Sequence, residues 1–323
     1  MMVFDTGRDA EVWAVTFHPD GKHLLGGNDD GIRRWQLVDG QEVGMQGGMR
    51  VFAISVSRDH KWIVCGTRFG ASVWNGEMRA KVIQVEGTNG VYAVDVSPDS
   101  TRFATGTGLG DSSASIWSIT TGTRLVGPLK HDNIIIGVRF SLDGEHIATA
   151  CVGKSIRIFD SHTGDNLVAI NTNVPDWLHP LAWSSDGHQI FAASQDKKIR
   201  TFDTSTGSQL AESQILQDGD SGITSLALAT NGNFIATYAN SERSIWFLDT
   251  STLARIGPVI QDGERVVSTA ISADSSHLAT GRLDGKIVIR DLGKILPDSY
   301  GPFHVSIGTC TLVACHVEFH LQH

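Results

Sequence analysis

Cysteine, basic clusters and long apolar runs are all scarce in this sequence. Four cysteines among 323 residues are too few for a disulfide framework, so we expect a reducing, intracellular setting, in the cytoplasm or the nucleus. No apolar stretch reaches the length of about 18 residues that indicates a membrane-spanning helix. The first residues show no basic segment followed by an apolar one, so we expect no secretory signal and no membrane partner.

Positive charge is also scarce, because 26 Lys and Arg residues stand against 35 Asp and Glu residues. The formal net charge of −9 gives no general attraction to phosphate, and the sequence contains no run of basic residues. Nucleic-acid-binding domains usually carry a basic face, so we expect no direct nucleic-acid partner. The hydrophobic fraction of 41% is ample for a core and argues against disorder.

Glycine, in contrast, is abundant, and its 35 residues indicate many tight turns. Seven segments share one pattern, in which an apolar run ends at a large apolar residue, here called the anchor. A turn residue follows each anchor by three positions, and successive turn residues are 39 to 45 positions apart. The anchors are Phe17, Val56, Val96, Phe140, Trp183, Leu228 and Ile271. The turn residues are Asp20, Asp59, Asp99, Asp143, Asp186, Asn231 and Asp274.

Further apolar runs follow each turn, and the third run of a segment usually ends in a bulky residue. These bulky residues are Trp35, Trp74, Trp117, Phe159, Phe202 and Leu248. Short alternating strands joined by Asp/Asn-Gly-type turns are typical of β-hairpins, and no stretch sustains a helical period long enough to demand a helix. A three-stranded meander plus an outer strand, repeated at this period, predicts the four-stranded blades of a β-propeller.

Two of these segments carry a family resemblance. The run SIRIFD at 155–160, followed by a Thr-Gly turn, and the run VWAVTFHPDG at 12–21 resemble strands of WD (WD40) repeats. The repeats are divergent, because no Trp in the sequence is followed by Asp. The resemblance covers residues 1–292 and implies an all-β, seven-bladed WD-type β-propeller. Residues 293–323 then form a C-terminal tail, either a truncated extra repeat or a disordered extension.

In this family the N-terminal strand usually completes the last blade. Residues Met1–Phe4 fall in register with the outer strands of later segments, so we expect them to close the ring. WD blades also commonly link a His before the first strand to an Asp before the third. The His position holds a histidine only at His131, whereas the Asp position is filled by Asp29, Asp111, Asp196 and Asp284. We therefore expect backbone groups or water to satisfy these Asp side chains.

Two local motifs resemble a nucleotide-binding site and a metal-binding site, but we interpret neither of them as a functional site. The run Gly153-Lys154-Ser155 resembles the end of a P-loop, but Ala148 stands where the motif needs its first Gly, and a strand follows instead of a helix. The tail carries thiol and imidazole groups that suit zinc, although their spacing within one apolar run gives poor geometry. They are Cys310, Cys315, His316, His320 and His323. We interpret the two motifs as a hairpin turn and chance composition, and we expect no cofactor and no metal.

The resemblance implies that the positions four and six before each anchor line the mouth of the central tunnel, on the narrower face. Three aromatic residues occupy the first of these positions in consecutive blades, and Arg and aromatic residues often anchor interfaces. The predicted partner-binding residues are Trp13, Arg50, Phe52, Tyr92, Trp177 and His179. The alternative is that these rings are half buried and only fill gaps between blades.

We expect a non-catalytic scaffold, a monomeric propeller within a larger complex that binds protein or peptide partners on the propeller face. One alternative is a ligand-sensing or regulatory WD module associated with an NTPase-type signalling regulator, although the sequence carries no NTPase motif. A propeller enzyme is a weaker alternative, because the chain has no GxSxG elbow and no HExxH motif. The Trp-Asp-x-Arg sequence typical of ubiquitin-ligase substrate receptors is also missing.

Overall fold

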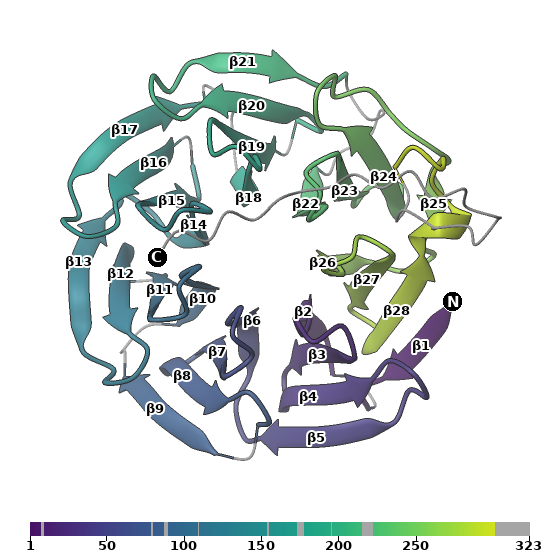
Figure 1. Ribbon diagram of the computed structural model, residues 1–323, viewed down its shortest axis with the longest axis horizontal. Coiled ribbons are helices and arrows are strands. Elements are labelled where there is room, and N and C mark those ends of the chain that lie inside the picture. The colour runs from purple at the N-terminus through teal and green to yellow at the C-terminus, as the bar shows by residue number, and fades with distance from the viewer. Residues whose placement is uncertain are drawn as a thin grey trace, which may run out of the picture.

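The computed structural model describes residues 1–7, 10–78, 80–86, 90–108, 110–153, 155–172, 178–194, 196–214 and 222–300. These residues form seven four-stranded antiparallel sheets arranged as a ring around a central channel (Figure 1). Each sheet is one blade, and in the first six blades the strands run in sequence order from the channel to the rim. The predicted all-β, seven-bladed propeller is therefore confirmed.

The strands of the first four blades follow the predicted repeat. Blade 1 comprises β2 (Val12–Phe17), β3 (His23–Asn28), β4 (Gly31–Gln36) and β5 (Glu42–Gly47). Blade 2 comprises β6 (Val51–Val56), β7 (Trp62–Thr67), β8 (Gly70–Asn75) and β9 (Lys81–Glu86). Blade 3 comprises β10 (Val91–Val96), β11 (Arg102–Thr107), β12 (Ser113–Ser118) and β13 (Arg124–Lys130). Blade 4 comprises β14 (Ile135–Phe140), β15 (His146–Cys151), β16 (Ser155–Asp160) and β17 (Asn166–Asn171).

The remaining blades differ in their outer strands. Blade 5 comprises β18 (Leu178–Trp183), β19 (Gln189–Ser194), β20 (Ile199–Asp203) and β21 (Gln209–Glu212). Blade 6 comprises β22 (Ile223–Leu228), β23 (Phe234–Ala239), β24 (Ser244–Asp249) and the two-residue β25 (Ile260–Gln261). Blade 7 comprises β26 (Val266–Ile271), β27 (His277–Arg282) and β28 (Lys286–Asp291), and a short 3-10 helix, η1 (Leu292–Lys294), follows.

The fourth strand of blade 7 comes from the other end of the chain. Strand β1 (Met2–Asp5) pairs antiparallel with β28, with Met2 opposite Ile289 and Asp5 opposite Lys286 (Figure 1). The predicted closure by the N-terminal strand is therefore confirmed, displaced by one residue. Within β1, the Phe4 side chain is 5% exposed and stacks on Trp35 of blade 1, with ring centroids 5.7 Å apart. The closing strand thus packs against the first blade as well as completing the last.

Neighbouring blades approach closely because small residues stand where the inner strand of the next blade crosses. A Cβ atom added at Gly27 would lie 2.6 Å from a Val51 methyl carbon of blade 2. One added at Gly66 would lie 2.6 Å from the Val91 carbonyl oxygen of blade 3. These contacts are closer than van der Waals packing permits, so part of the glycine surplus serves blade-to-blade packing as well as turns.

The Asp side chains left over from the incomplete networks pair with cationic side chains, and two of them, Asp196 and Asp284, also accept a backbone N–H, as expected. Asp29 pairs with Arg50, Asp111 with Lys130 and Asp196 with Arg200. Asp284 lies between Arg282 and Lys286 and also accepts the Lys286 backbone N–H. The sequence pattern showed that the His residues are absent. It did not show that basic side chains would pair with these Asp residues instead.

Blade 7 contains a buried ionic version of the network. Asp262 precedes its anchor by nine residues, as His131 does in blade 4, and its side chain is 0% exposed. Its Oδ2 lies 2.5 Å from Nη2 of Arg290, and its Oδ1 lies 3.3 Å from Nε of Arg282. Arg290 also donates from Nη1 to Oγ1 of Thr280 at 3.0 Å. One buried carboxylate therefore pairs with two largely buried guanidinium groups, and that of Arg282 also pairs with Asp284.

The predicted boundary at 292/293 stays a prediction, and residues 301–323 lie outside the described residues. The part of the predicted tail that is described packs on the propeller. Leu296 is 5% exposed and lies in a cluster with Phe247 and Tyr238 of blade 6. The Tyr300 hydroxyl donates to Oδ2 of Asp249 at 2.7 Å.

Replacing Phe4 by Ala is expected to lower the free energy of unfolding by about 3 kcal/mol, because it removes a buried ring from the closing seam. Urea unfolding followed by circular dichroism measures this change. The control is Val3→Ala in the same strand, whose side chain is 50% exposed and whose loss is expected to cost less than about 1 kcal/mol. Equal effects of the two variants would show that the ring does not stabilise the closure.

Replacing Asp262 by Ala is expected to cost about 3–5 kcal/mol of stability, because the largely buried Arg290 loses its counter-charge and Arg282 keeps only Asp284. The same unfolding measurement applies. The matched control is Asp111→Ala, since Asp111 and Lys130 are 41% and 63% exposed and such surface pairs contribute at most about 1 kcal/mol. A loss as small as that of the control would contradict a stabilising role for the ionic network.

Candidate binding site at the channel mouth

The seven inner strands enclose a channel cavity of about 240 Å³. These strands are β2, β6, β10, β14, β18, β22 and β26, one from each blade (Figure 1). The lining residues near the starts of the strands include Trp13, Phe52, Tyr92, Ile136, Thr224 and Val267. Each of them precedes its anchor by four positions, as the resemblance implied for the mouth of the tunnel.

A repeated irregularity in strand pairing explains why these side chains reach the channel. The pairing of β2 with β3 passes from Val12 directly to Ala14, so Trp13 has no partner in the ladder. The same shift passes over Phe52 in β6 and Tyr92 in β10, and it recurs in the inner strands of the other blades. A β-bulge leaves its extra residue unpaired and redirects its side chain. In six blades the repeat therefore presents one redirected side chain at the mouth.

Three of the redirected residues are aromatic and touch one another. The Trp13 and Phe52 rings meet edge to face, with centroids 6.5 Å apart. The Phe52 and Tyr92 rings are stacked, with centroids 4.9 Å apart. The Arg50 guanidinium lies 5.3 Å from the Trp13 ring centroid and 6.0 Å from that of Phe52. All three rings are partly buried, so the cluster is rigid and still presents apolar surface.

Asp29 joins this cluster and was not among the predicted binding residues. Its Oδ1 accepts a hydrogen bond from Trp13 Nε1 at 2.8 Å and lies 2.5 Å from Nε of Arg50. Its Oδ2 accepts from Nη2 of Arg50 at 2.9 Å. The sequence placed Asp29 in the network of its own blade. Its contact with Arg50 could have been found only by recognising that the β3–β4 turn lies beside the loop that enters blade 2.

A second missed residue is Phe69, which is 62% exposed in the turn between β7 and β8. Thr67 at the end of β7 pairs with Val51 at the start of β6. This pairing places the turn at the same end of blade 2 as Arg50 and Phe52. The sequence signal that could have identified Phe69 was an apolar residue in a two-residue turn.

Two predicted binding residues are not tested by the geometry. Trp177 lies outside the described residues, and His179 lies within β18, where only the course of the backbone is described. The structure thus brings together Trp13, Phe52, Tyr92 and Arg50. It does not place Trp177 or His179 relative to them.

Deeper in the channel, polar side chains join the inner strands of neighbouring blades. Asp95 of β10 accepts a hydrogen bond from the Ser55 hydroxyl of β6 at 3.3 Å, and its Oδ1 lies 3.8 Å from Nη1 of Arg139 of β14. Burial raises the pKa of the Asp95 carboxyl, and the Arg139 charge opposes this effect. On the other side of the ring, the Ser225 and Thr269 hydroxyls are 2.7 Å apart. These contacts hold the blades that carry the mouth in a fixed arrangement.

Comparison with known proteins agrees with this architecture. The family model described as "WD domain, G-beta repeat" matches residues 2–36, 80–118, 124–160 and 181–203. In the described part of the chain, no helix has the length and apolar character needed to cross a membrane.

Three curated relatives are similar over much of the chain. "Protein tipD" of Dictyostelium discoideum is 26% identical over 298 residues, covering 88% of this chain and 40% of that protein. "Autophagy-related protein 16" of Arabidopsis thaliana is 28% identical over 284 residues, covering 85% and 46%. "WD repeat and SOCS box-containing protein 1" of Takifugu rubripes is 25% identical over 211 residues, covering 57% and 48%. The chain thus spans less than half the length of each of these relatives. The chain thus folds as a seven-bladed propeller, and four of its segments are similar to the WD-repeat family model.

Proposed function

We propose that this chain is a non-catalytic interaction platform that binds a protein or peptide at the mouth of its channel. The proposed site is the mouth patch, defined as Trp13, Asp29, Arg50, Phe52 and Tyr92. The observation that carries the proposal is the contiguous set of three rings capped by an Arg–Asp pair. Aromatic and Arg side chains contribute most of the binding energy at protein interfaces.

The geometry suggests how a partner would be held. An apolar side chain of the partner would lie against the Trp13, Phe52 and Tyr92 rings, which lose little conformational entropy because they already pack on one another. Asp29 fixes the orientations of Trp13 and Arg50 through two hydrogen bonds. A guanidinium group has five N–H donors, so Arg50 retains donors for an acidic group of the partner. This arrangement favours a partner with an apolar residue next to an acidic one.

We further propose that the chain acts as a monomeric propeller inside a larger complex, in the cytoplasm or the nucleus. The matched relatives are more than twice as long as the regions they share with it. A platform that works together with additional domains or chains is consistent with that difference.

The combined substitution Trp13→Ala and Phe52→Ala is expected to abolish capture of at least one specific partner. The full chain, carrying an affinity tag, is used to pull down proteins from extracts of its own source cells. The control is Leu142→Ala, because Leu142 is 46% exposed and lies in the β14–β15 turn, at the opposite end of the blades from the mouth. An identical partner set for the wild type and both variants would refute the mouth patch as the binding surface.

Replacing Arg50 by Ala is expected to lower the free energy of unfolding by less than about 1 kcal/mol, because the Arg50 side chain is 44% exposed and its ion pair is screened by water. Partner capture should nevertheless weaken. Chemical denaturation provides the measurement, with Arg290→Ala as a strongly destabilised comparison. A large loss of stability in Arg50→Ala would mean that the patch is mainly structural.

A further inference from the structure

The turn between the first and second strands of each blade has a repeated chemistry. In blades 2, 3, 4, 5 and 7, a serine directly after the anchor donates its hydroxyl to the turn Asp at 2.5–2.6 Å. The same serine oxygen accepts the first backbone N–H of the next strand at 2.9 Å. The serine hydroxyl therefore links the turn Asp to the start of the next strand.

Blade 1 departs from this pattern by placing His18 where the serine stands elsewhere. The turn residue Asp20 is retained, and the next strand begins with His23. Nδ1 of His18 lies 3.0 Å from Oδ2 of Asp20, and Nδ1 of His23 lies 2.6 Å from the same oxygen. The three atoms all lie within 4.8 Å of one another. Two imidazole nitrogens thus converge on one carboxylate oxygen.

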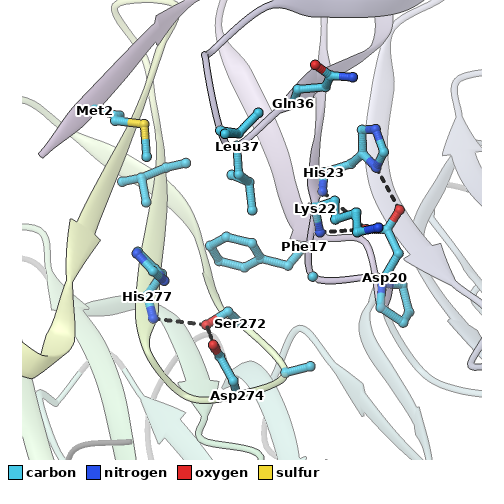
Figure 2. Close-up of a pocket in the computed structure, with 15 residues that line it drawn as sticks. Met2, Phe17, Asp20, Lys22, His23, Gln36, Leu37, Ser272, Asp274 and His277 are labelled. Carbon is cyan, nitrogen blue, oxygen red and sulfur yellow. Dashed lines mark hydrogen bonds and ion pairs between the residues drawn. The ribbon is translucent and has the colours of Figure 1, made fainter. Parts of the chain in front are cut away.

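This cluster borders a cavity of about 690 Å³ between blades 7 and 1. Figure 2 shows Asp20 and His23 on one wall of the cavity, with Phe17 and Leu37 between them and Ser272, Asp274 and His277 of blade 7. The ring of His18 lies behind this wall, only 3% exposed. Its Nε2 atom has no hydrogen-bond partner among the described residues. One ligand is therefore buried, and the other two are open to the cavity.

We propose that His18, Asp20 and His23 form a binding site for Zn²⁺ or a similar late first-row divalent ion. The ligands would be Nδ1 of His18, Nδ1 of His23 and Oδ2 of Asp20, with the fourth position facing the cavity. Two imidazoles and a carboxylate with one open position are a known ligand set for zinc. Metal–ligand bonds of about 2.0–2.2 Å require ligand atoms roughly 3.3 Å apart. Small rotations of the two rings and the carboxylate would supply that spacing.

Arg34 lies against two of the proposed ligands and would compete with a bound metal ion. Its Nη2 lies 3.0 Å from Nδ1 of His23 and 3.6 Å from Oδ2 of Asp20. Its Nη1 donates to the Gly76 carbonyl oxygen at 2.9 Å. Because a guanidinium and a divalent ion repel each other, the two would compete for Asp20 and His23. Removing the charge at position 34 should therefore tighten metal binding.

The test is Zn²⁺ titration of the full chain by calorimetry, repeated with Co²⁺ and followed by visible absorption. The double variant His18→Ser/His23→Gln restores in blade 1 the serine turn of the five other blades, so it should fold. It is expected to lose one equivalent of bound metal or to bind it at least about 100-fold more weakly, since losing even an outer-shell partner of a ligand costs 10–100-fold. Arg34→Gln should bind Zn²⁺ more tightly than the wild type.

The matched control is His277→Gln. His277 occupies in blade 7 the position of His23 and borders the same cavity, but it follows a serine turn. This variant should bind metal like the wild type. The cysteines and histidines of the tail are present in every variant, so any binding by them cancels in the comparison. Equal stoichiometry and affinity in wild type and double variant, or weaker binding by Arg34→Gln, would overturn the proposal.

Discussion

The structure depends on closing the ring with a strand from the opposite end of the chain. Strand β1 supplies the fourth strand of blade 7, and Phe4 stacks on Trp35 of blade 1, so a single segment of four residues joins the last blade to the first. An open ring would expose the edge of β28 to pairing with other chains. The His18 cluster lies in blade 1, which borders this seam, and the mouth patch begins in the same blade with Trp13 and Asp29.

Blade 1 carries different chemistry at its two ends. At the start of β2, Trp13 joins the rings and the Arg50–Asp29 pair at the channel mouth. At the end of β2, Phe17 leads into His18 and the cavity shared with blade 7. Only the residues from Ala14 to Phe17 therefore separate a surface suited to a protein partner from a cluster suited to a metal ion. Strand β2 pairs with β3 and contacts the inner strands β26 and β6 of the neighbouring blades, which keeps the two sites at a constant separation.

Much of the fold was predictable because it follows from short-range patterns. Anchors, turn residues and their spacing predicted seven blades, and register with later segments predicted the closing strand. The three rings at the mouth were also predictable, since they recur at one position of the repeat. The Asp29–Arg50 pair, the buried Asp262 network and the contact of His18 with His23 were not predicted. Each depends on loops or blades whose proximity appears only when the strands are paired and the ring is closed.

The bulge at the start of each inner strand has a consequence for how such a surface can change. The redirected residue contributes no bond to the ladder, so its identity is uncoupled from strand pairing. Here the six positions that line the cavity range from Trp13 to Thr224 and Val267. A ring of this kind is a fixed scaffold with interchangeable side chains at its mouth. Its binding specificity can therefore change one blade at a time while the fold stays the same.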